Sequence, residues 1–345
     1  MLQYSQNRGR TGDGGAKLSA LPVGPNRNGT QNNTRRNTAM ARRIIDSHAH
    51  LGDIFHYNKN ISFKTNVKKG DYEDRFIDLE ESLFTKPLFT GDPRDLDLVI
   101  DGGQYRCWES TLENLTKQLD DNDMAGIVML PVLPNTSFEE YLAASKLEPR
   151  IIPFTTCVLD MPIDEMCDKL RQDIKNGARG LKLHPTIQNV ALDDPRIEAA
   201  VQVFTDADLP VLTHCGANAY YTEDDPHSRE SNPMFSDFET AVKPFCHKWS
   251  NTKIIVAHSA SICDVLYEGV KDLNNVWTDT SMCSAAMMRR AVELLGEDKV
   301  LFGTDVPFGS FHYSVAELEK AFADRPDLLD KVGYTNIADL MNLEY

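Results

Sequence analysis

The sequence has no CxxC pair, and its seven cysteines are scattered between Cys107 and Cys283. Such spacing is typical of reduced thiols in a cytoplasmic protein and argues against a disulfide framework. No apolar run approaches the roughly 20 residues that a membrane-spanning helix needs, so we expect no membrane span. Basic residues are outnumbered, with 36 Lys and Arg against 52 Asp and Glu and a net charge of −16. This excess of negative charge argues against nucleic acid or an anionic membrane as the main partner.

The basic residues that are present concentrate at the N-terminus. Residues 1–43 hold eight Lys or Arg and one Asp, and the remainder holds 28 basic and 51 acidic residues. The segment is rich in Gly, Asn, Arg and Thr and has neither an apolar periodicity nor the apolar region of a secretory signal. We therefore predict a disordered basic leader over residues 1–42, ahead of one domain over residues 43–345. Translation that starts at Met40 explains this leader better than a targeting role does.

Short runs of β-branched and apolar residues recur after Met40, and most are followed by a segment of helical period. Near-continuous apolar strands that alternate with helices are typical of a parallel sheet covered by helices. No GxGxxG motif follows the first run, which disfavours a doubly wound nucleotide-binding sheet. Eight such units in about 300 residues favour an α/β fold of the (β/α)8 TIM-barrel type. The eight predicted strands span residues 42–50, 126–132, 150–158, 178–185, 209–215, 252–259, 274–281 and 298–305.

Two histidines separated by one residue end the first predicted strand, in the stretch IIDSHAH. In a strand, side chains at i and i+2 point to one face about 6.6 Å apart along the strand, whereas a helix would place them about 200° apart. The same alternation predicts Ile44 on the face of the histidines and Ile45 on the face toward the helices. The imidazoles of His48 and His50 can therefore approach one metal ion.

Histidine or aspartate also lies at the end of other predicted strands. In a barrel of parallel strands, the carboxyl ends meet on the rim that holds the active site. A single histidine at a strand end is more often structural, but an ordered set on one rim indicates a functional site. The set comprises His184, His214, His258 and Asp305, at the ends of the fourth, fifth, sixth and eighth predicted strands.

These motifs, DSHAH, GLKLHP, LTHCG, VAHSA and FGTDVPF, resemble those of the amidohydrolase superfamily. The likeness is to the amidohydrolase-related branch, which includes aminocarboxymuconate-semialdehyde decarboxylase and many metal-dependent hydrolases, and it covers nearly the whole chain from about residue 43. The resemblance implies that His48, His50, His214 and Asp305 ligate the metal. It also implies that His258 lies beside the metal-bound water.

The chemistry of this donor set agrees with that assignment. Three neutral imidazoles and a carboxylate leave a position open for water, and zinc lowers the pKa of such a water to about 7. Asp305 would accept its proton and return it to a leaving group, while His258 would orient the water or stabilise an oxyanion. We expect one divalent ion, zinc, with manganese or iron as alternatives.

Lys182, two residues before His184, allows two interpretations. Some amidohydrolases bridge two metal ions with a carboxylated lysine on the fourth strand. The simpler interpretation is an ammonium that pairs with a carboxylate, such as that of Asp46, or with the substrate. We favour the second because Lys182 lies below the strand end.

Two segments are longer than a barrel requires: residues 52–107, a lid-like insertion after the first strand, and residues 216–236 after the fifth. Long loops at this rim commonly shape the substrate pocket. We predict substrate contacts from Lys182, His184 and Arg229.

Two further groups receive no catalytic role from the sequence. Tyr220 and Tyr221 are better explained as solvated loop residues, and Asp279 as structural.

Three functions fit these observations. The first is a metal-dependent hydrolase, in which metal-activated water attacks an amide, ester or lactone carbonyl of a small carboxylate-bearing substrate. The alternative is a metal-dependent non-oxidative decarboxylase of an aromatic or dienoic acid. A barrel that only binds its ligand is disfavoured, because it would not need the extra base. We expect a small-molecule substrate, and a homodimer is the default for an enzyme of this kind.

Overall fold

The computed structural model describes residues 43–55, 74–223 and 225–343. The predicted leader and residues 56–73 of the insertion lie outside these ranges. Within the described ranges, no helix is long and apolar enough to cross a membrane.

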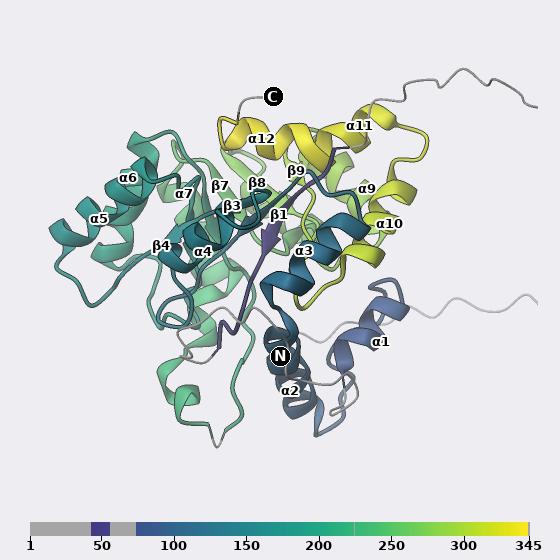
Figure 1. Cartoon of the computed structure of the whole chain (residues 1–345), viewed down its shortest axis with the longest axis horizontal. Coiled ribbons are helices and arrows are strands. Elements are labelled where there is room, and N and C mark those ends of the chain that lie inside the picture. Colours follow the sequence, from purple (N-terminus) through teal and green to yellow (C-terminus); the bar gives the residue numbers. More distant parts are fainter. Residues whose placement is uncertain (1–42, 56–73, 224, 344–345) are drawn as a thin grey trace, which may run out of the picture. The chain divides into compact units, whose positions relative to one another are not determined.

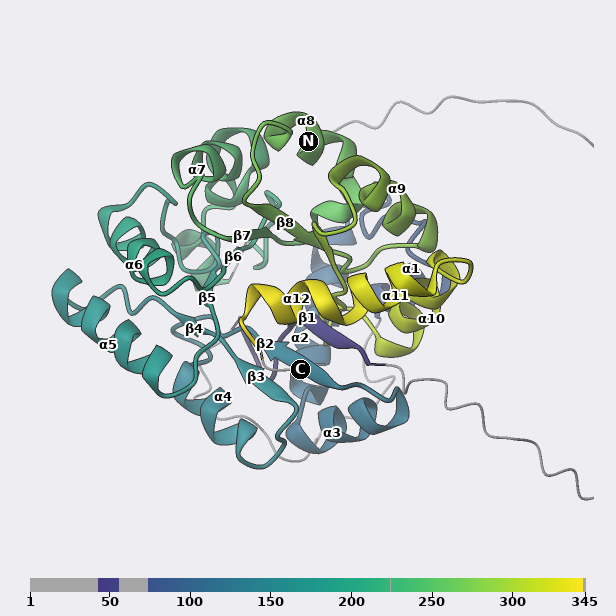
Figure 2. The ribbon, with the colours of Figure 1, turned by 90° about the horizontal axis from the view of Figure 1, so that it is seen from above.

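The strands form a closed parallel barrel, which confirms the predicted fold (Figure 2). The third predicted strand is divided at Phe154 into β3 and β4. The ladder continues across this break, because the Phe154 N–H donates to the Met129 carbonyl at 3.0 Å and the Thr155 N–H donates to the Gly180 carbonyl at 2.9 Å. A parallel bridge between Ala49 and Val306 joins the last strand to the first. The strands are β1 (Ile45–Ala49), β2 (Gly126–Met129), β3 (Ile151–Pro153), β4 (Thr155–Thr156), β5 (Leu181–Leu183), β6 (Val211–Thr213), β7 (Ile254–Val256), β8 (Val276–Asp279) and β9 (Val300–Leu301).

Helices follow the strands and cover the barrel (Figures 1 and 2). Several begin at a side-chain cap; Ser137 and Glu140, for example, form a reciprocal capping box at the start of α4. The helices are α1 (Arg75–Glu81), α2 (Asp95–Glu109), α3 (Leu112–Asp121), α4 (Phe138–Ser145), α5 (Ile163–Lys175), α6 (Pro195–Asp206), α7 (Lys243–Lys248), α8 (Cys263–Val270), α9 (Ala285–Leu295), α10 (Phe311–Ala321), α11 (Pro326–Asp330) and α12 (Asn336–Leu340).

The barrel interior is filled by alternate side chains of the strands. Val128, Phe154, Leu212, Ile255 and Leu301 belong to one buried cluster, which residues of α12 complete. Figure 2 shows α12 crossing the barrel at the amino ends of the strands. The carboxyl ends, which carry the predicted site, face the opposite end, where α1 and α2 lie (Figure 1).

The first strand departs from simple alternation. Ile45 packs in the interior cluster and Ile44 packs among residues of the covering helices, the reverse of the sequence prediction. The register of β1 against β2 shifts between Asp46 and Ala49. Because of this irregularity, the alternation counted from His48 does not extend back to Ile44.

The insertion after β1 contains two helices, α1 and α2, which the sequence prediction left undefined. Arg106 of α2 connects this insertion to the barrel. Its guanidinium donates to Asp74 at 2.8 Å, to Glu80 at 2.8 Å and to the carbonyl of Phe308 at 2.9 Å. The insertion is therefore held against the loop that follows β9.

Candidate active site

His48 and His50 are each held by a hydrogen bond on one ring nitrogen. The Nδ1 atom of His48 lies 2.9 Å from Oδ2 of Asp279, and Nδ1 of His50 lies 2.8 Å from the carbonyl oxygen of Leu130. Both acceptors require a proton on Nδ1, so Nε2 of each ring carries the lone pair. This tautomer is the usual arrangement of metal-ligating histidines, whose second nitrogen donates to a carboxylate or a carbonyl.

Asp305 brings the two histidines to one point. Its Oδ1 atom lies 3.4 Å from Nε2 of His48 and 3.6 Å from Nε2 of His50. The backbone N–H of Asp305 donates to the carbonyl of His48 at 2.8 Å, which joins the end of β9 to β1. Residues about 255 positions apart in the sequence thus meet at the carboxyl end of the barrel.

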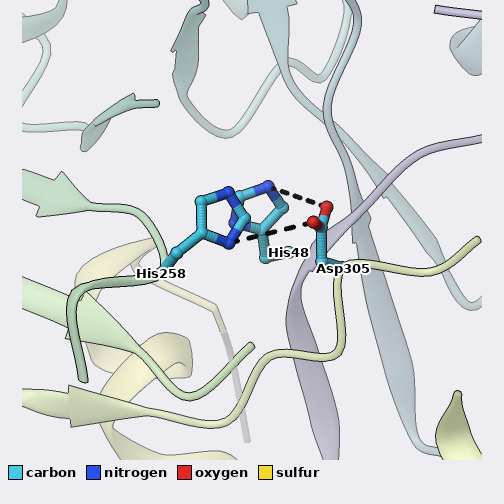
Figure 3. Close-up of side chains that lie close together, drawn as sticks. All are labelled: His48, His258 and Asp305. Atoms are coloured by element: carbon cyan, nitrogen blue, oxygen red, sulfur yellow. Dashed lines mark ion pairs between the residues drawn. The ribbon is translucent and has the colours of Figure 1, made fainter. Parts of the chain in front are cut away.

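His258 completes the group and lies beside His48, with ring centroids 4.5 Å apart. Its Nδ1 atom lies 3.8 Å from Oδ2 of Asp305 (Figure 3). Ligand atoms of His48, His258 and Asp305 all lie within 4.8 Å of one another. His258 and Asp305 both have a left-handed backbone, with φ of 60° and 59°. Non-glycine residues rarely adopt this conformation, and it is concentrated at functional sites.

Burial determines the charge of these groups. It lowers the pKa of His48, His50 and His214 well below the usual value and that of His258 to about 3. The imidazoles are therefore neutral at pH 7, which is the form that ligates a metal ion.

His214 lies beside the group with a partner of its own. Its ring stacks on that of His184 with centroids 4.2 Å apart, and it lies 5.1 Å from the ring of His258. The Nε2 atom of His214 is 2.6 Å from the hydroxyl of Tyr220. To bind a metal ion through Nε2, His214 would have to give up this hydrogen bond with Tyr220.

The residues fit a metal ion, because one buried nitrogen lacks a hydrogen-bond partner. Nε2 of His48 is buried and has no such partner among the described residues. A buried polar atom without a partner costs free energy of about 1–3 kcal/mol. An ion held by Nε2 of His48 and by Asp305 would satisfy this nitrogen.

A cavity of about 200 Å³ opens above the group. His50, His184, His214, His258 and Asp305 line its inner end. Its other walls are mainly apolar and aromatic. They consist of Ile54, Phe55, Phe76, Leu88, Phe89, Val99, Ile100, Gly103, Cys215, Asn218, Ala219, Tyr220, Met282 and Phe308.

Comparison with known proteins agrees with this architecture. The sequence model of the family described as Amidohydrolase matches residues 45–343. The chain belongs to the amidohydrolase family. No curated protein sequence matches it.

Solved structures place this amidohydrolase-family chain among TIM barrels. A 5-carboxyvanillate decarboxylase from Sphingomonas paucimobilis matches with 13% identity and a TM-score of 0.57, over 88% of this chain and 100% of that chain. A probable 2-pyrone-4,6-dicarboxylic acid hydrolase from Acinetobacter baumannii matches with 14% identity and a TM-score of 0.52, over 87% and 99%. A 5-carboxyvanillate decarboxylase from Novosphingobium aromaticivorans, complexed with manganese, matches with 13% identity and a TM-score of 0.55, over 87% and 96%. At these identities the likeness establishes the fold.

Lys182 of this amidohydrolase-family chain lies inside the barrel, behind the cavity lining. Its side chain is fully buried, and Nζ has no hydrogen-bond partner among the described residues. Burial lowers the pKa of Lys182 to about 8, while the carboxylates of Asp305 and Asp279 act in the opposite direction.

The carboxylate of Asp46, the partner that the sequence suggested for Lys182, accepts from the N–H groups of His48 and Thr304, each at 3.0 Å. The pairing of Lys182 with Asp46 suggested by the sequence therefore does not appear among the described contacts.

The residues of the loop after β6 are not placed as the sequence suggested. Arg229 lies on a 3₁₀ helix (Pro226–Glu230), is exposed and does not line the cavity. Tyr221 is 5% exposed and its hydroxyl donates to the carbonyl of Phe55 at 2.9 Å. The prediction of solvated tyrosines was therefore wrong. Packing against the insertion buries Tyr221, and Tyr220 lines the cavity beside His214.

Asp279, which the sequence assigned to structure alone, orients the site. Besides holding His48, its Oδ1 atom accepts from the N–H of Ser281 at 3.0 Å. The signal in the sequence was its place at the end of the seventh predicted strand, on the same rim as the histidines. Because its partner His48 is 231 residues away, no local pattern connects them.

We expect Asp279→Ala to weaken metal binding about 10- to 100-fold, because His48 would lose the acceptor that fixes its tautomer and orientation. Asp279→Asn should also weaken binding, because its single amide oxygen cannot accept from both the Ser281 N–H and Nδ1 of His48. Metal dissociation constants from chelator competition, with circular dichroism to check folding, test this. Asp298→Ala, which removes an exposed carboxylate, is the matched control. Equal affinity in Asp279→Ala and the parent chain would contradict the positioning role.

Proposed function

We propose that this chain is a metal-dependent, non-oxidative decarboxylase of an aromatic or dienoic carboxylic acid. The observation that carries the proposal is the cavity, in which neutral imidazoles and Asp305 occupy one end of an otherwise apolar and aromatic chamber. Of the described residues that line it, none is Lys or Arg. Loss of CO2 disperses the charge of a carboxylate, so surroundings that solvate this charge poorly favour the reaction. The aromatic walls also suit a planar substrate.

We further propose that His48, His50, His214 and Asp305 hold one divalent ion. His258 lies close enough to Asp305 to replace His214 in this set. Imidazole and carboxylate donors suit zinc, which the sequence predicts, and manganese, which the Novosphingobium structure contains. The ion would supply positive charge that binds the carboxylate or a neighbouring oxygen and withdraws electrons from the ring.

The residues of the chain then have separate tasks. Asp305 would take up a proton from solvent on Oδ2, the oxygen that faces His258 rather than His48 and His50, and would deliver it to the carbon that bears the carboxylate. The bond from that carbon to the carboxyl group would break, its electron pair would return to the ring, and CO2 would leave. His184, stacked on His214, would contact the substrate, while the ammonium of Lys182 would balance the carboxylates of Asp305 and Asp279 from below.

Hydrolysis of an amide, ester or lactone is the second candidate, and the sequence favoured it. His258 and Asp305 form a pair at 3.8 Å that could accept a proton from an attacking water. The cavity favours decarboxylation instead, because its mainly apolar and aromatic lining solvates a substrate carboxylate poorly and so promotes the loss of that charge as CO2.

Isotope labelling separates the two reactions. Metal-loaded protein would be incubated with carboxyl-¹³C-labelled 2,6-dihydroxybenzoate, a monocarboxylate, and, in parallel, with 2-pyrone-4,6-dicarboxylate and simple aryl esters in H₂¹⁸O. Metal-dependent release of ¹³CO2 is the expected result. Incorporation of ¹⁸O without CO2 release would replace the proposal with hydrolysis. Neither product from fully metal-loaded protein would overturn both assignments for these substrates.

A further inference from the structure

The outer part of the cavity is built largely by the insertion after β1. Phe76, Leu88, Phe89, Val99, Ile100 and Gly103 of this segment line it. We refer to these six residues, together with Phe55 and Phe308, as the apolar arm. The rings of Phe55 and Phe76 each contact that of Phe308, with centroids 5.6 and 5.7 Å apart. The arm is therefore a packed aromatic wall.

The positive charge of Arg106 lies outside the apolar arm. Arg106, on the same helix as Gly103, is bound to Asp74 and Glu80. It lines a separate polar cavity with those two carboxylates. Arg106 also donates to the backbone carbonyl of Phe308, and the ring of Phe308 still lines the arm. An anionic substituent in the arm would therefore lose its hydration without gaining a cation from the described lining.

Gly103 leaves space where any other residue would project. A Cβ atom built on it would lie 3.4 Å from Cε1 of Phe308 and 3.6 Å from Cε2 of Phe76, both ordinary contact distances. The neighbouring Gly102 is also helical, and its Cβ would lie 3.5 Å from Oδ1 of Asp74. Gly102 does not line the cavity. A small residue at position 103 therefore preserves volume in the arm, whereas one at position 102 does not.

We propose that the apolar arm receives an uncharged alkyl or aryl substituent of the substrate, directed away from Asp305, and that Gly103 sets the size of that substituent. This inference rests on the proposed function, because it takes the polar end of the substrate to lie at the histidines and Asp305. It narrows the substrate class to aromatic or dienoic monocarboxylates with an apolar extension and disfavours dicarboxylates.

The test measures binding to the metal-loaded protein by calorimetry. The probes are benzoate, its 3- and 4-methyl, ethyl and propyl derivatives, and the dicarboxylate terephthalate. In at least one ring position, we expect affinity to rise about fourfold per added carbon, the transfer free energy of one methylene. Terephthalate should bind at least about tenfold more weakly than the best alkylbenzoate, because its second carboxylate would be desolvated without a partner.

Variants at the two adjacent glycines locate the effect. Gly103→Leu should abolish the gain from ethyl and propyl groups while benzoate binds within about twofold of the parent chain. Gly103→Ala should shorten the favoured substituent, and it keeps the test valid if the leucine variant fails to fold. Gly102→Ala, an identical change in the same helix turn, should leave the series unchanged. Thermal unfolding checks that each variant is folded.

The results separate this inference from the proposed reaction. Three results would overturn the inference even if the protein releases CO2. Affinity could stay constant along both alkyl series, terephthalate could bind most tightly, or Gly103→Leu could weaken the binding of every probe equally. Size-dependent binding without CO2 release would retain the apolar arm and reject the decarboxylase.

Discussion

Asp305→Asn is expected to lower the rate of CO2 release about 10³-fold or more while the barrel remains folded. The substitution keeps the shape of the side chain and the backbone N–H that donates to His48. It removes the negative charge that faces His48 and His50 at 3.4 and 3.6 Å. It also removes the acid that we propose as the proton donor, and such a group typically contributes 10²- to 10⁴-fold.

The measurement is the initial rate of ¹³CO2 release from the best substrate, with metal content and thermal unfolding recorded on the same sample. Asp264→Asn is the matched control, because Asp264 is an exposed carboxylate paired with Arg290. An exposed, salt-screened ion pair of this kind contributes little to stability, so activity should be unchanged. A rate for Asp305→Asn within about tenfold of the parent chain would remove Asp305 from the proton transfer.

His48→Ala is expected to release the metal ion and abolish activity. The parent chain should bind about one divalent ion, as a mononuclear site of this donor type does. In the variant, the loss of Nε2, the buried nitrogen without a hydrogen-bond partner, leaves too few donors to hold the ion. Elemental analysis after dialysis against a metal-free buffer measures the stoichiometry. The ion should also raise the thermal midpoint of the parent chain and not that of the variant.

Three further variants define the ligand set. His312→Ala, the same change at an exposed histidine, should keep the full metal content. Comparison of His214→Ala with His258→Ala shows which ring completes the site, because only the ligand should lower stoichiometry. Nearly two ions per chain would instead assign a bridging role to Lys182. Unchanged metal content in His48→Ala would reject the proposed centre.

The barrel strands were predictable because their signal is local. Each strand is a short apolar run, and the predicted segments at residues 126–132 and 209–215 contain β2 and β6. The position of a histidine or an aspartate at the end of such a run also identifies the rim on which its side chain lies. His48, His50, His214, His258 and Asp305 could therefore be selected together, and the structure brings all five to one cavity region.

The contacts that orient those residues were not predictable. The hydrogen bond that Asp279 accepts from His48 and the one between Tyr220 and His214 depend on where a distant strand or a long loop places one side chain. Arg229 shows the converse: its charge suited a carboxylate, but its helix leaves it exposed and outside the cavity. Residue type indicates what a group can bind, whereas the loop conformation determines whether it reaches the site.

The sequence alone was enough to predict the eight barrel strands and the candidate residues at their carboxyl ends, because each strand is a local apolar run and each candidate residue lies at the end of one. Three features became apparent only in the folded chain: the irregular first strand, the tautomers of the histidines and the apolar walls of the cavity. Those features arise from contacts between segments far apart in the chain, such as His48 with Asp279 and Gly103 with Phe308. Packing free energy selects these contacts from many pairings that the local sequence permits equally well.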